Sequence, residues 1–212
     1  MWVMMIGGMD TVTSLSDGLV FLAAVLRRPS VMGAVAPSSR GLSEQVASVV
    51  PRLGRPTVLE LGAGTGAVST VVSQRLPPGG RLLAVEIDSM LADRLQRAHP
   101  EVTVLHGDAA ELGALLASAG ASQVDAVVCS LPWSLFSAEL QHQILAQVCQ
   151  ALAPGAAFST FAYRHAMPLA GARRFRALLA DYFDEVMITR TVWRNLPPAS
   201  VYVCRRPIRG ST

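Results

Sequence analysis

Short apolar runs alternate with mixed apolar and polar segments along most of the chain. The runs have the length and β-branched content of buried strands, and the longer segments between them have helical character. The predicted strands are 57–61, 81–86, 102–106, 124–129 and 156–163. The predicted helices lie near 66–75, 88–98, 109–118, 137–151 and 170–180. This alternation predicts a mostly parallel sheet with helices on both faces, which is an α/β architecture.

The C-terminal part departs from the alternation. Two β-rich runs, Glu185–Trp193 and Ser200–Arg205, flank the sequence Asn195-Leu196-Pro197-Pro198. This pattern predicts an antiparallel hairpin with a proline-rich turn. We therefore expect a sheet of seven strands that is parallel except at its C-terminal hairpin.

The N-terminal part is predicted to be helical. Asp10–Arg28 has a helical pattern that Pro29 should end. A second helix is expected at Leu42–Val50, with its cap in Pro37-Ser38-Ser39. We expect residues 1–50 to form an N-terminal extension and residues 51–212 to form the main domain.

Composition narrows the class of protein. The chain has 212 residues, 51% hydrophobic and 16% charged, which suits one well-buried domain. It has no run of 18 apolar residues, so we expect no spanning helix, and Met1–Met9 lacks the features of a signal peptide. Three separated cysteines indicate buried, reduced thiols in the cytoplasm, and the four histidines show no metal-ligand spacing. All 18 basic residues are arginines, and a net charge of only +3 argues against a nucleic-acid partner.

Candidate ligand-binding residues follow each of the first four predicted strands. Parallel strands place their carboxyl ends at one edge of the sheet, where ligands bind. Glycines that alternate after the first strand allow a ligand to approach the backbone, and the next two strands end in acids. The predicted cofactor-binding residues are Glu60, Gly62, Ala63, Gly64, Gly66, Glu86, Ile87, Asp108, Ala109 and Ser130, with Ser38 from the N-terminal cap.

The glycine turn resembles the first motif of class I S-adenosylmethionine (SAM) methyltransferases. Glu86 stands where an acid accepts the ribose hydroxyls, and Asp108 fits an acceptor for the adenine amino group. Each acid alone could instead begin or cap a helix. A nicotinamide cofactor is the alternative ligand, since it also uses an acid after the second strand. The spacing of the glycines and the acid after the third strand favour SAM.

The chain as a whole resembles the bacterial phospholipid N-methyltransferases, a branch near the rRNA adenine dimethylases. Residues 56–163 carry the general likeness, and Arg28–Ser39, Arg194–Ala199 and Val201–Val203 carry the closer one. The resemblance implies an N-terminal amphipathic helix on the membrane surface, with residues 19–26 as its apolar part. The same helix could instead pack as a lid over the cofactor.

The segment after the fourth strand bears on the methyl acceptor. Nucleic-acid amino-methyltransferases have Asn-Pro-Pro-Tyr or Asn-Leu-Pro-Tyr there, whereas this chain has Ser130-Leu131-Pro132-Trp133. Serine lacks the amide acceptor, and the Trp133 ring could hold a substrate ammonium by cation–π attraction. Tyr163 and His165 are candidate bases, and Tyr163 could also line an aromatic cage. The candidate substrate contacts are Arg164 and Arg194, as ligands for a lipid phosphate, and Tyr202.

These features predict a SAM-dependent methyltransferase that N-methylates a phospholipid amine such as phosphatidylethanolamine. The main alternative is a soluble small-molecule acceptor at N, O or C. Methylation of rRNA adenine and SAM binding without catalysis are less favoured. We expect a cytoplasmic protein with peripheral contact at the inner face of the membrane, and the sequence does not predict an oligomeric state.

Overall fold

The computed structural model of the chain describes residues 38–208. The expected helix at Asp10–Arg28 and the segment Arg28–Pro37 lie outside the described residues. Within residues 38–208, none of the helices is both long enough and apolar enough to span a bilayer.

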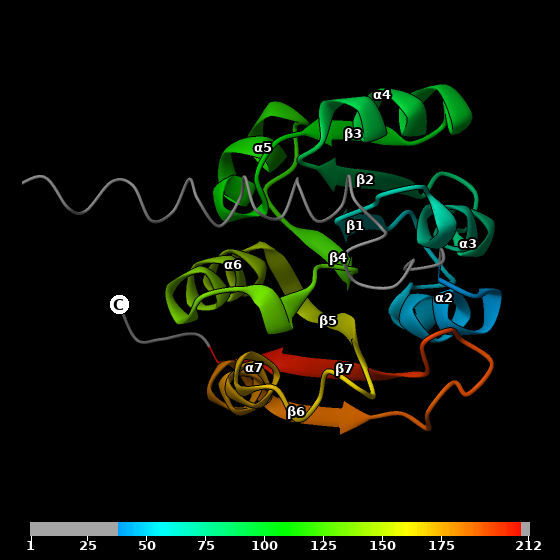
Figure 1. Cartoon of the computed structure of the whole chain (residues 1–212). Helices are drawn as coiled ribbons and strands as arrows, with labels where there is room; N and C mark the ends of the chain where they lie inside the picture. The colour runs from blue at the N-terminus through cyan, green and yellow to red at the C-terminus, as the bar shows by residue number, and fades with distance from the viewer. Residues whose placement is uncertain (1–37, 209–212) are drawn as a thin grey trace, which may run out of the picture. The chain divides into compact units, whose positions relative to one another are not determined.

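Seven strands form one sheet with the order β3-β2-β1-β4-β5-β7-β6 (Figure 1). Strands β1 to β5 pair in parallel, and β7 pairs antiparallel with both β5 and β6. The expected fold class is therefore confirmed. The strands are β1 (Thr57–Leu61), β2 (Arg81–Glu86), β3 (Thr103–His106), β4 (Val124–Cys129), β5 (Leu152–Tyr163), β6 (Phe183–Ile188) and β7 (Ala199–Pro207).

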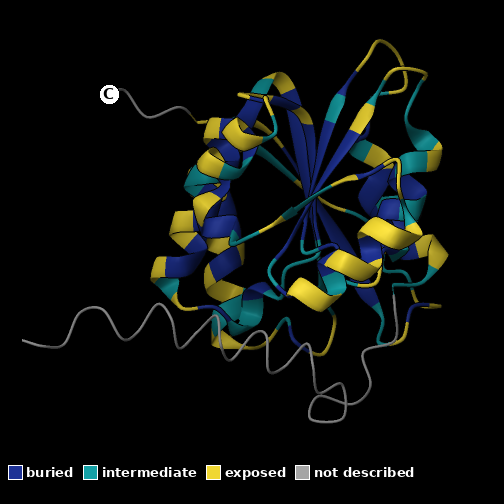
Figure 2. Cartoon of the chain, turned by 90° about the horizontal axis from the view of Figure 1, so that it is seen from above, coloured by how far each residue is buried: buried dark blue, intermediate teal, exposed yellow. Residues whose placement is uncertain are grey.

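Helices cover both faces of this sheet. Helices α2, α3 and α4 lie on one side and α5, α6 and α7 on the other, with the buried strands as the middle layer (Figures 1 and 2). The central strands are almost wholly buried, which explains their continuous apolar sequences. The α-helices are α2 (Arg40–Val46), α3 (Ala67–Arg75), α4 (Ser89–Ala98), α5 (Leu112–Ser118), α6 (Ala138–Ala151) and α7 (Ala170–Tyr182). Short 3-10 turns are η2 (Ala47–Val49), η3 (Ala109–Glu111) and η4 (Trp133–Leu135).

Helix α2 is part of the main core. Leu42 and Val46 are fully buried and belong to the apolar cluster that includes β1 and β7 side chains. The Ser159 hydroxyl of β5 donates a 2.7 Å hydrogen bond to the carbonyl of Val46. The expected boundary after residue 50 is therefore wrong, because α2 and the sheet share one compact unit. The expected cap is present, since Ser39 Oγ accepts from the amide of Leu42.

The connection between β6 and β7 lies at the carboxyl edge of the sheet, because Tyr163 at the end of β5 pairs with Ala199 at the start of β7. Strand β6 ends at Ile188, so the predicted strand Glu185–Trp193 is too long by five residues. A bridge between Val192 and Ala199 holds the connection. Its turn residue Asn195 is buried, accepting at Oδ1 from the amide of Ser39 at 2.8 Å. The connection is thereby tied to the start of α2.

Candidate active site at the carboxyl edge of the sheet

The glycine turn between β1 and α3 leaves open space at one position. Gly64 has φ +56°, and a Cβ built there would meet no atom of residues 38–208 within 4 Å. At Gly62 and Gly66, by contrast, a Cβ would lie 2.9 Å from Leu131 Cδ2 and 2.8 Å from Leu95 Cδ1. Gly62 and Gly66 therefore permit close packing, whereas Gly64 is the glycine that leaves room for a ligand against the backbone.

Glu86, at the end of β2, is tied directly to this turn. It is 2% exposed, and its Oε2 accepts from the amide of Gly64 at 2.8 Å. Its Oε1 accepts from the amide of Asp88 at 3.0 Å. Each carboxylate oxygen keeps a further lone pair for a donor. The arrangement fits an acid that accepts ribose hydroxyls while it holds the turn in place.

Glu60, at the end of β1, is fully buried, and neither carboxylate oxygen has a hydrogen-bond partner among residues 38–208. Burial raises its pKa from 4.5 to about 8, and the nearby charge of Glu86 adds to the rise. The nearby hydroxyl and amide of Ser69, which do not reach hydrogen-bond geometry with the carboxyl, lower the pKa by less than burial raises it. A buried carboxyl without partners, beside a second acid, is a favourable place for a cationic ligand.

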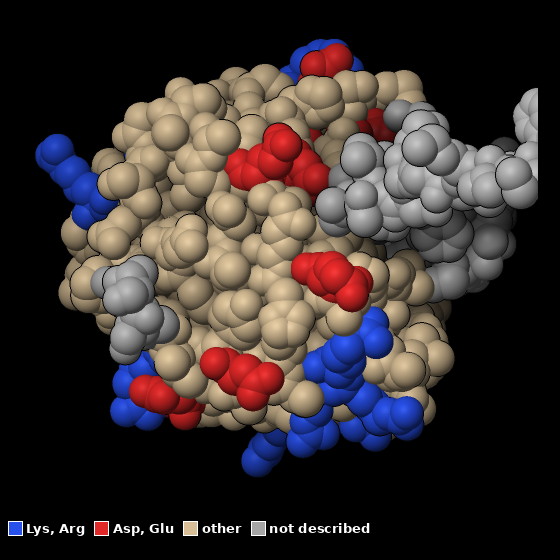
Figure 3. Space-filling view, turned by 90° about the vertical axis from the view of Figure 1, so that its left-hand side faces the viewer, with Lys and Arg blue, Asp and Glu red and all other residues tan. Residues whose placement is uncertain are grey.

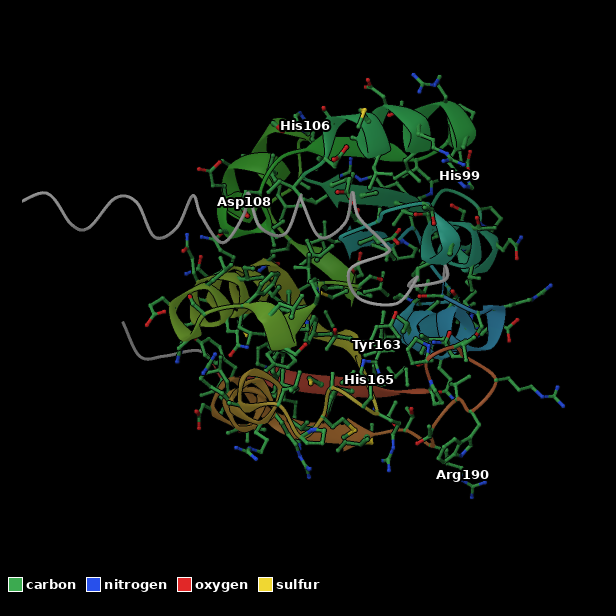
Figure 4. The ribbon with its side chains drawn as sticks, viewed as in Figure 1. His99, His106, Asp108, Tyr163, His165 and Arg190 are labelled. Carbon is green, nitrogen blue, oxygen red and sulfur yellow. The ribbon has the colours of Figure 1, made fainter. Side chains whose placement is uncertain are left out.

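Asp108 follows β3 and caps the next turn. Its Oδ1 accepts from the amide of Ala110 at 2.9 Å, which leaves Oδ2 for another donor. The amide of Gly107 donates to the carbonyl of Glu86 at 3.0 Å, and His106 Nε2 lies 3.2 Å from the carbonyl of Ile87. These contacts hold the ends of β2 and β3 together, with His106 and Asp108 on the same side of the molecule (Figure 4). Ala109 beside them is buried.

Ser130 continues the site onto β4. Its amide donates to the carbonyl of Leu61 at 2.8 Å, so it lies next to the glycine turn. Its hydroxyl is buried and has no hydrogen-bond partner within residues 38–208. Glu60 and Ser130 therefore supply unpartnered buried polar groups at the carboxyl ends of β1 and β4, the adjacent strands between which the strand order reverses.

The proposed substrate role of Trp133 is wrong in this structure. The side chain is 3% exposed and stacks on Phe175 at a centroid distance of 4.2 Å. Its Nε1 donates to the hydroxyl of Thr160 at 2.9 Å. Because one face and the polar edge of the ring are used inside the protein, Trp133 anchors the segment after β4 and offers no open face to an ammonium.

Tyr202 is also a core residue, so its predicted contact with substrate is wrong. It is 3% exposed and pairs with Thr160 and Ile188 on the strands to either side. Burial raises the pKa of its hydroxyl, and the nearby charge of Arg176 lowers it by less. Alternation along β7 points Val201 and Val203 into the core beneath α2, which leaves Tyr202 on the α7 side.

Tyr163 and His165 do lie together at the end of β5 (Figure 4). Their rings stack at a centroid distance of 5.8 Å, and Tyr163 also meets Phe161 edge to face. Burial raises the pKa of the Tyr163 hydroxyl, so the phenol stays neutral and is a poor base. His165 and Arg164 are exposed beside it. Arg194 is exposed on the β6–β7 connection, and Ser38 is half-buried just before α2.

Three buried polar residues that sequence reasoning missed support the site. Ser69 lies beside Glu60, and its position in the first turn of α3 is the signal that could have found it. Asn195 joins the β6–β7 connection to α2. Gln141 Nε2 donates to the carbonyls of Trp133 and Gly171, which fixes the segment after β4 against α7.

The cysteines and histidines all lie within the described part of the chain. Cys129, Cys149 and Cys204 are buried free thiols, as expected, and burial raises each pKa to about 12. Residues 38–208 contain no group of three metal-ligating side chains close enough to hold an ion.

Comparison with known proteins agrees with this geometry. Residues 58–155 match a family model described as a methyltransferase domain. The chain is 34% identical over 194 residues to an ornithine lipid N-methyltransferase of Singulisphaera acidiphila, covering 90% of this chain and 97% of that protein. An rRNA adenine N-6-methyltransferase of Bacillus licheniformis is 49% identical over 55 residues, covering only 24% of this chain and 18% of that protein.

Solved structures share the fold. The O-methyltransferase of Bacillus cereus in complex with SAH superposes with a TM-score of 0.64 at 16% identity, covering 93% of this chain and 94% of that one. The chain belongs to the class I SAM-dependent methyltransferases. Its cofactor is SAM, and the open space at Gly64, the paired acids Glu60 and Glu86 and the cap residue Asp108 fit that group.

Proposed function

We propose that this enzyme transfers methyl groups from SAM to the amine of a membrane lipid. The observation that carries the proposal is the 34% identity to an ornithine lipid N-methyltransferase over 97% of that protein. The acceptor is then a primary amine on a lipid head group, of which ornithine lipid and phosphatidylethanolamine are the two candidates to compare.

Residues at the ends of different strands would hold different parts of SAM. SAM supplies a methyl group that its sulfonium has already activated, so the protein has mainly to hold and orient the two reactants and exclude water. Glu86 and Asp108 would hold the ribose and adenine, and Glu60 with the turn at Gly64 would hold the cationic end. The unpartnered hydroxyl of Ser130 would accept a hydrogen bond at the reacting end.

The acceptor amine must lose a proton before it can attack. Tyr163 is unsuited to take it, since burial raises the pKa of the phenol. The ring instead forms an aromatic wall, and His165, stacked on it, is the candidate proton acceptor. Arg164 and Arg194 are exposed at the same edge and are candidate partners for a phosphate or carboxylate on the lipid.

A soluble amine is the second candidate acceptor, because many SAM enzymes with this fold act on small molecules and the fold does not select between them. Nucleic acid is disfavoured, since Ser130 replaces the asparagine of the amino-methyltransferase motif and the match to an rRNA methyltransferase covers a short segment only.

The deciding experiment incubates the protein with SAM and four acceptors. These are phosphatidylethanolamine, ornithine lipid, free ethanolamine and free ornithine, with products read by mass spectrometry. We expect one to three added methyl groups on a lipid and none on the free amines. Glu86→Gln should lower the yield of product when SAM is limiting, and Asp93→Asn, a change at an exposed acid on α4, should not. Methylation of the free amines alone would overturn the proposal.

A further inference from the structure

The connection between β6 and β7, residues 189–198, exposes large apolar side chains at the edge of the sheet that carries the site. Trp193 is 72% exposed and Leu196 is 76% exposed. Ile188 and Met187, just before the connection, are also exposed. These four are half of the eight exposed large apolar residues within residues 38–208, which makes this short stretch the place where such side chains concentrate.

The connection holds these side chains in a fixed backbone. Val192 donates to the carbonyl of Ala199 at 2.8 Å, and Thr189 donates to that of Val201 at 2.9 Å. Asn195 is buried, accepts a hydrogen bond from the amide of Ser39 and donates one to the carbonyl of Pro197. These hydrogen bonds hold the connection at three residues, and Trp193 and Leu196 remain exposed on it.

The same stretch is basic. Arg190 and Arg194 are exposed on it, and Arg164 is joined to it by an amide that donates to the carbonyl of Pro198 at 2.8 Å. The sequence holds no acidic residue after Glu185. Nine of the 18 arginines but only three of the 15 acids lie beyond Glu139. Figure 3 shows a different face, the one that carries α5 to α7; most of that face is uncharged, and its arginine atoms gather mainly at the lower right.

We propose that the β6–β7 connection docks on an anionic lipid surface, with Trp193 and Leu196 entering the interface and Arg190 and Arg194 meeting head-group phosphates. This inference rests on the proposed function, because a lipid acceptor requires such a surface. Tryptophan favours the boundary between water and acyl chains, and arginine adds attraction to anionic lipids. Since Tyr163 pairs with Ala199 at the start of β7, docking here would turn the acceptor side of the site toward the bilayer.

A lipid surface fits the connection better than a second copy of the chain does. A symmetric dimer through this stretch would bring its exposed arginines against the same arginines of the partner, with no acid within the stretch to offset them. An anionic surface satisfies both the apolar and the basic side chains.

The test is sedimentation of the full chain with vesicles of phosphatidylglycerol, compared with vesicles of phosphatidylcholine. We expect Trp193→Ser combined with Leu196→Ser to weaken binding to the anionic vesicles about tenfold. The matched control is Leu53→Ser, which removes an 86% exposed leucine from the segment before β1, at the opposite edge of the sheet. Equal binding of the double variant and the wild type, or an equal loss in Leu53→Ser, would overturn the proposal.

Charge is tested by a second matched pair. Arg190→Gln with Arg194→Gln should weaken binding and flatten its dependence on salt, whereas Arg52→Gln with Arg55→Gln, also exposed and before β1, should change neither. Identical salt dependence in both pairs would contradict a docking surface at 189–198. If Trp193→Ser with Leu196→Ser converts a dimer to a monomer and leaves vesicle binding unchanged, the surface joins two copies of the chain, and the proposal fails.

Failure of this inference can be told from failure of the proposed function. Lipid dispersed in detergent removes the need to dock, so the double variant at Trp193 and Leu196 should methylate dispersed lipid at the wild-type rate and lose activity only on vesicles. Vesicle binding that depends on Trp193 and Leu196, without any lipid methylation, would leave the surface in place and overturn the lipid substrate. If the enzyme methylates lipid and the double variant binds vesicles as well as the wild type does, the lipid substrate stands and the docking surface is overturned.

Discussion

Glu86 Oε2 accepts a 2.8 Å hydrogen bond from the amide of Gly64, so the acid of the second strand holds the glycine turn that follows the first. The two elements are 22 residues apart in sequence. One carboxylate therefore shapes the turn, and we propose that it also accepts the ribose hydroxyls of SAM. Loss of this carboxylate should affect binding in two ways at once, through the ribose contact and through the geometry of the turn.

The first prediction follows from this bond. Glu86→Gln should weaken SAM binding at least about tenfold in titration calorimetry, because the charge that accepts ribose hydroxyls is lost. Asp93→Asn serves as the control, since it removes an exposed acid from α4 without touching the turn. Unchanged affinity in Glu86→Gln would show that the acid of β2 does not hold the cofactor.

The second prediction separates ligand space from backbone strain. Gly64→Ala and Gly120→Ala both place alanine at a positive φ, +56° and +66°, where no atom in the described part of the chain lies within 4 Å of the new Cβ. Both should lose about 1 kcal/mol of stability. Only Gly64→Ala should also lose SAM affinity, because only its Cβ enters the site. Equal affinity in the two variants would place the ligand elsewhere.

The third prediction concerns Glu60 and pH. Its folded-state pKa of about 8 lies above the ordinary value of 4.5. Below pH 4.5 both states hold the proton. Between pH 4.5 and 8 the unfolded state releases a proton that the folded state keeps, so the free energy of unfolding falls as pH rises through this window.

Glu60→Gln should remove that fall. At pH 8 the variant without cofactor should be more stable than the wild type, on the order of 2–4 kcal/mol by urea unfolding, and it should bind SAM more weakly. The prediction would be contradicted if the free energy of unfolding of the wild type rose between about pH 5 and 8 and that of Glu60→Gln followed the same curve.

The fourth prediction tests the buried role of Trp133. Trp133→Phe leaves the Thr160 hydroxyl without its partner and should cost about 1–3 kcal/mol of stability, with the KM for lipid changed by less than about twofold. Trp193→Phe, at an exposed position, should leave stability unchanged. A large rise in KM with unchanged stability in Trp133→Phe would restore the cation–π hypothesis.

The fifth prediction assigns the proton acceptor beside β5. Tyr163→Phe should keep kcat within about threefold, since the phenol is neutral and contributes its ring. His165→Gln should lower kcat about tenfold or more, with the loss greatest at the pH where the wild type is fastest. A drop of about 100-fold in Tyr163→Phe would instead make its hydroxyl part of the chemistry.

The positions of the parallel strands and the acids at their ends could be predicted because each is encoded locally. A buried strand followed by Glu60 and three glycines, or by Glu86, carries its signal within a few residues. The limits of β5 were harder, because Pro154 and Gly155 resemble a turn although the strand begins at Leu152. The length of β6 was overestimated because the connection after it is also β-branched and apolar.

The direction in which a side chain points depends on partners far along the chain, and here the sequence misled. Trp133 is held by Thr160, 27 residues later, and its aromatic character alone does not show which way the ring faces. Tyr202 takes its side of the sheet from the register of β7. Asn195 is a turn residue, yet its side chain accepts a hydrogen bond from the amide of Ser39, 156 residues away.

Strand β7, the last of the seven in sequence, lies between β5 and β6 in the sheet. During synthesis, a chain that has reached β6 must leave an open place beside β5 until Ala199–Pro207 emerges. Until then β5 and β6 expose unpaired edges, and Asn195 has not yet joined Ser39. Ser39 thus leaves the ribosome well before β7 can pair with β5 and β6 and complete the sheet that carries the active site. The order of synthesis exposes this protein to aggregation at its latest stage, just before the sheet is complete.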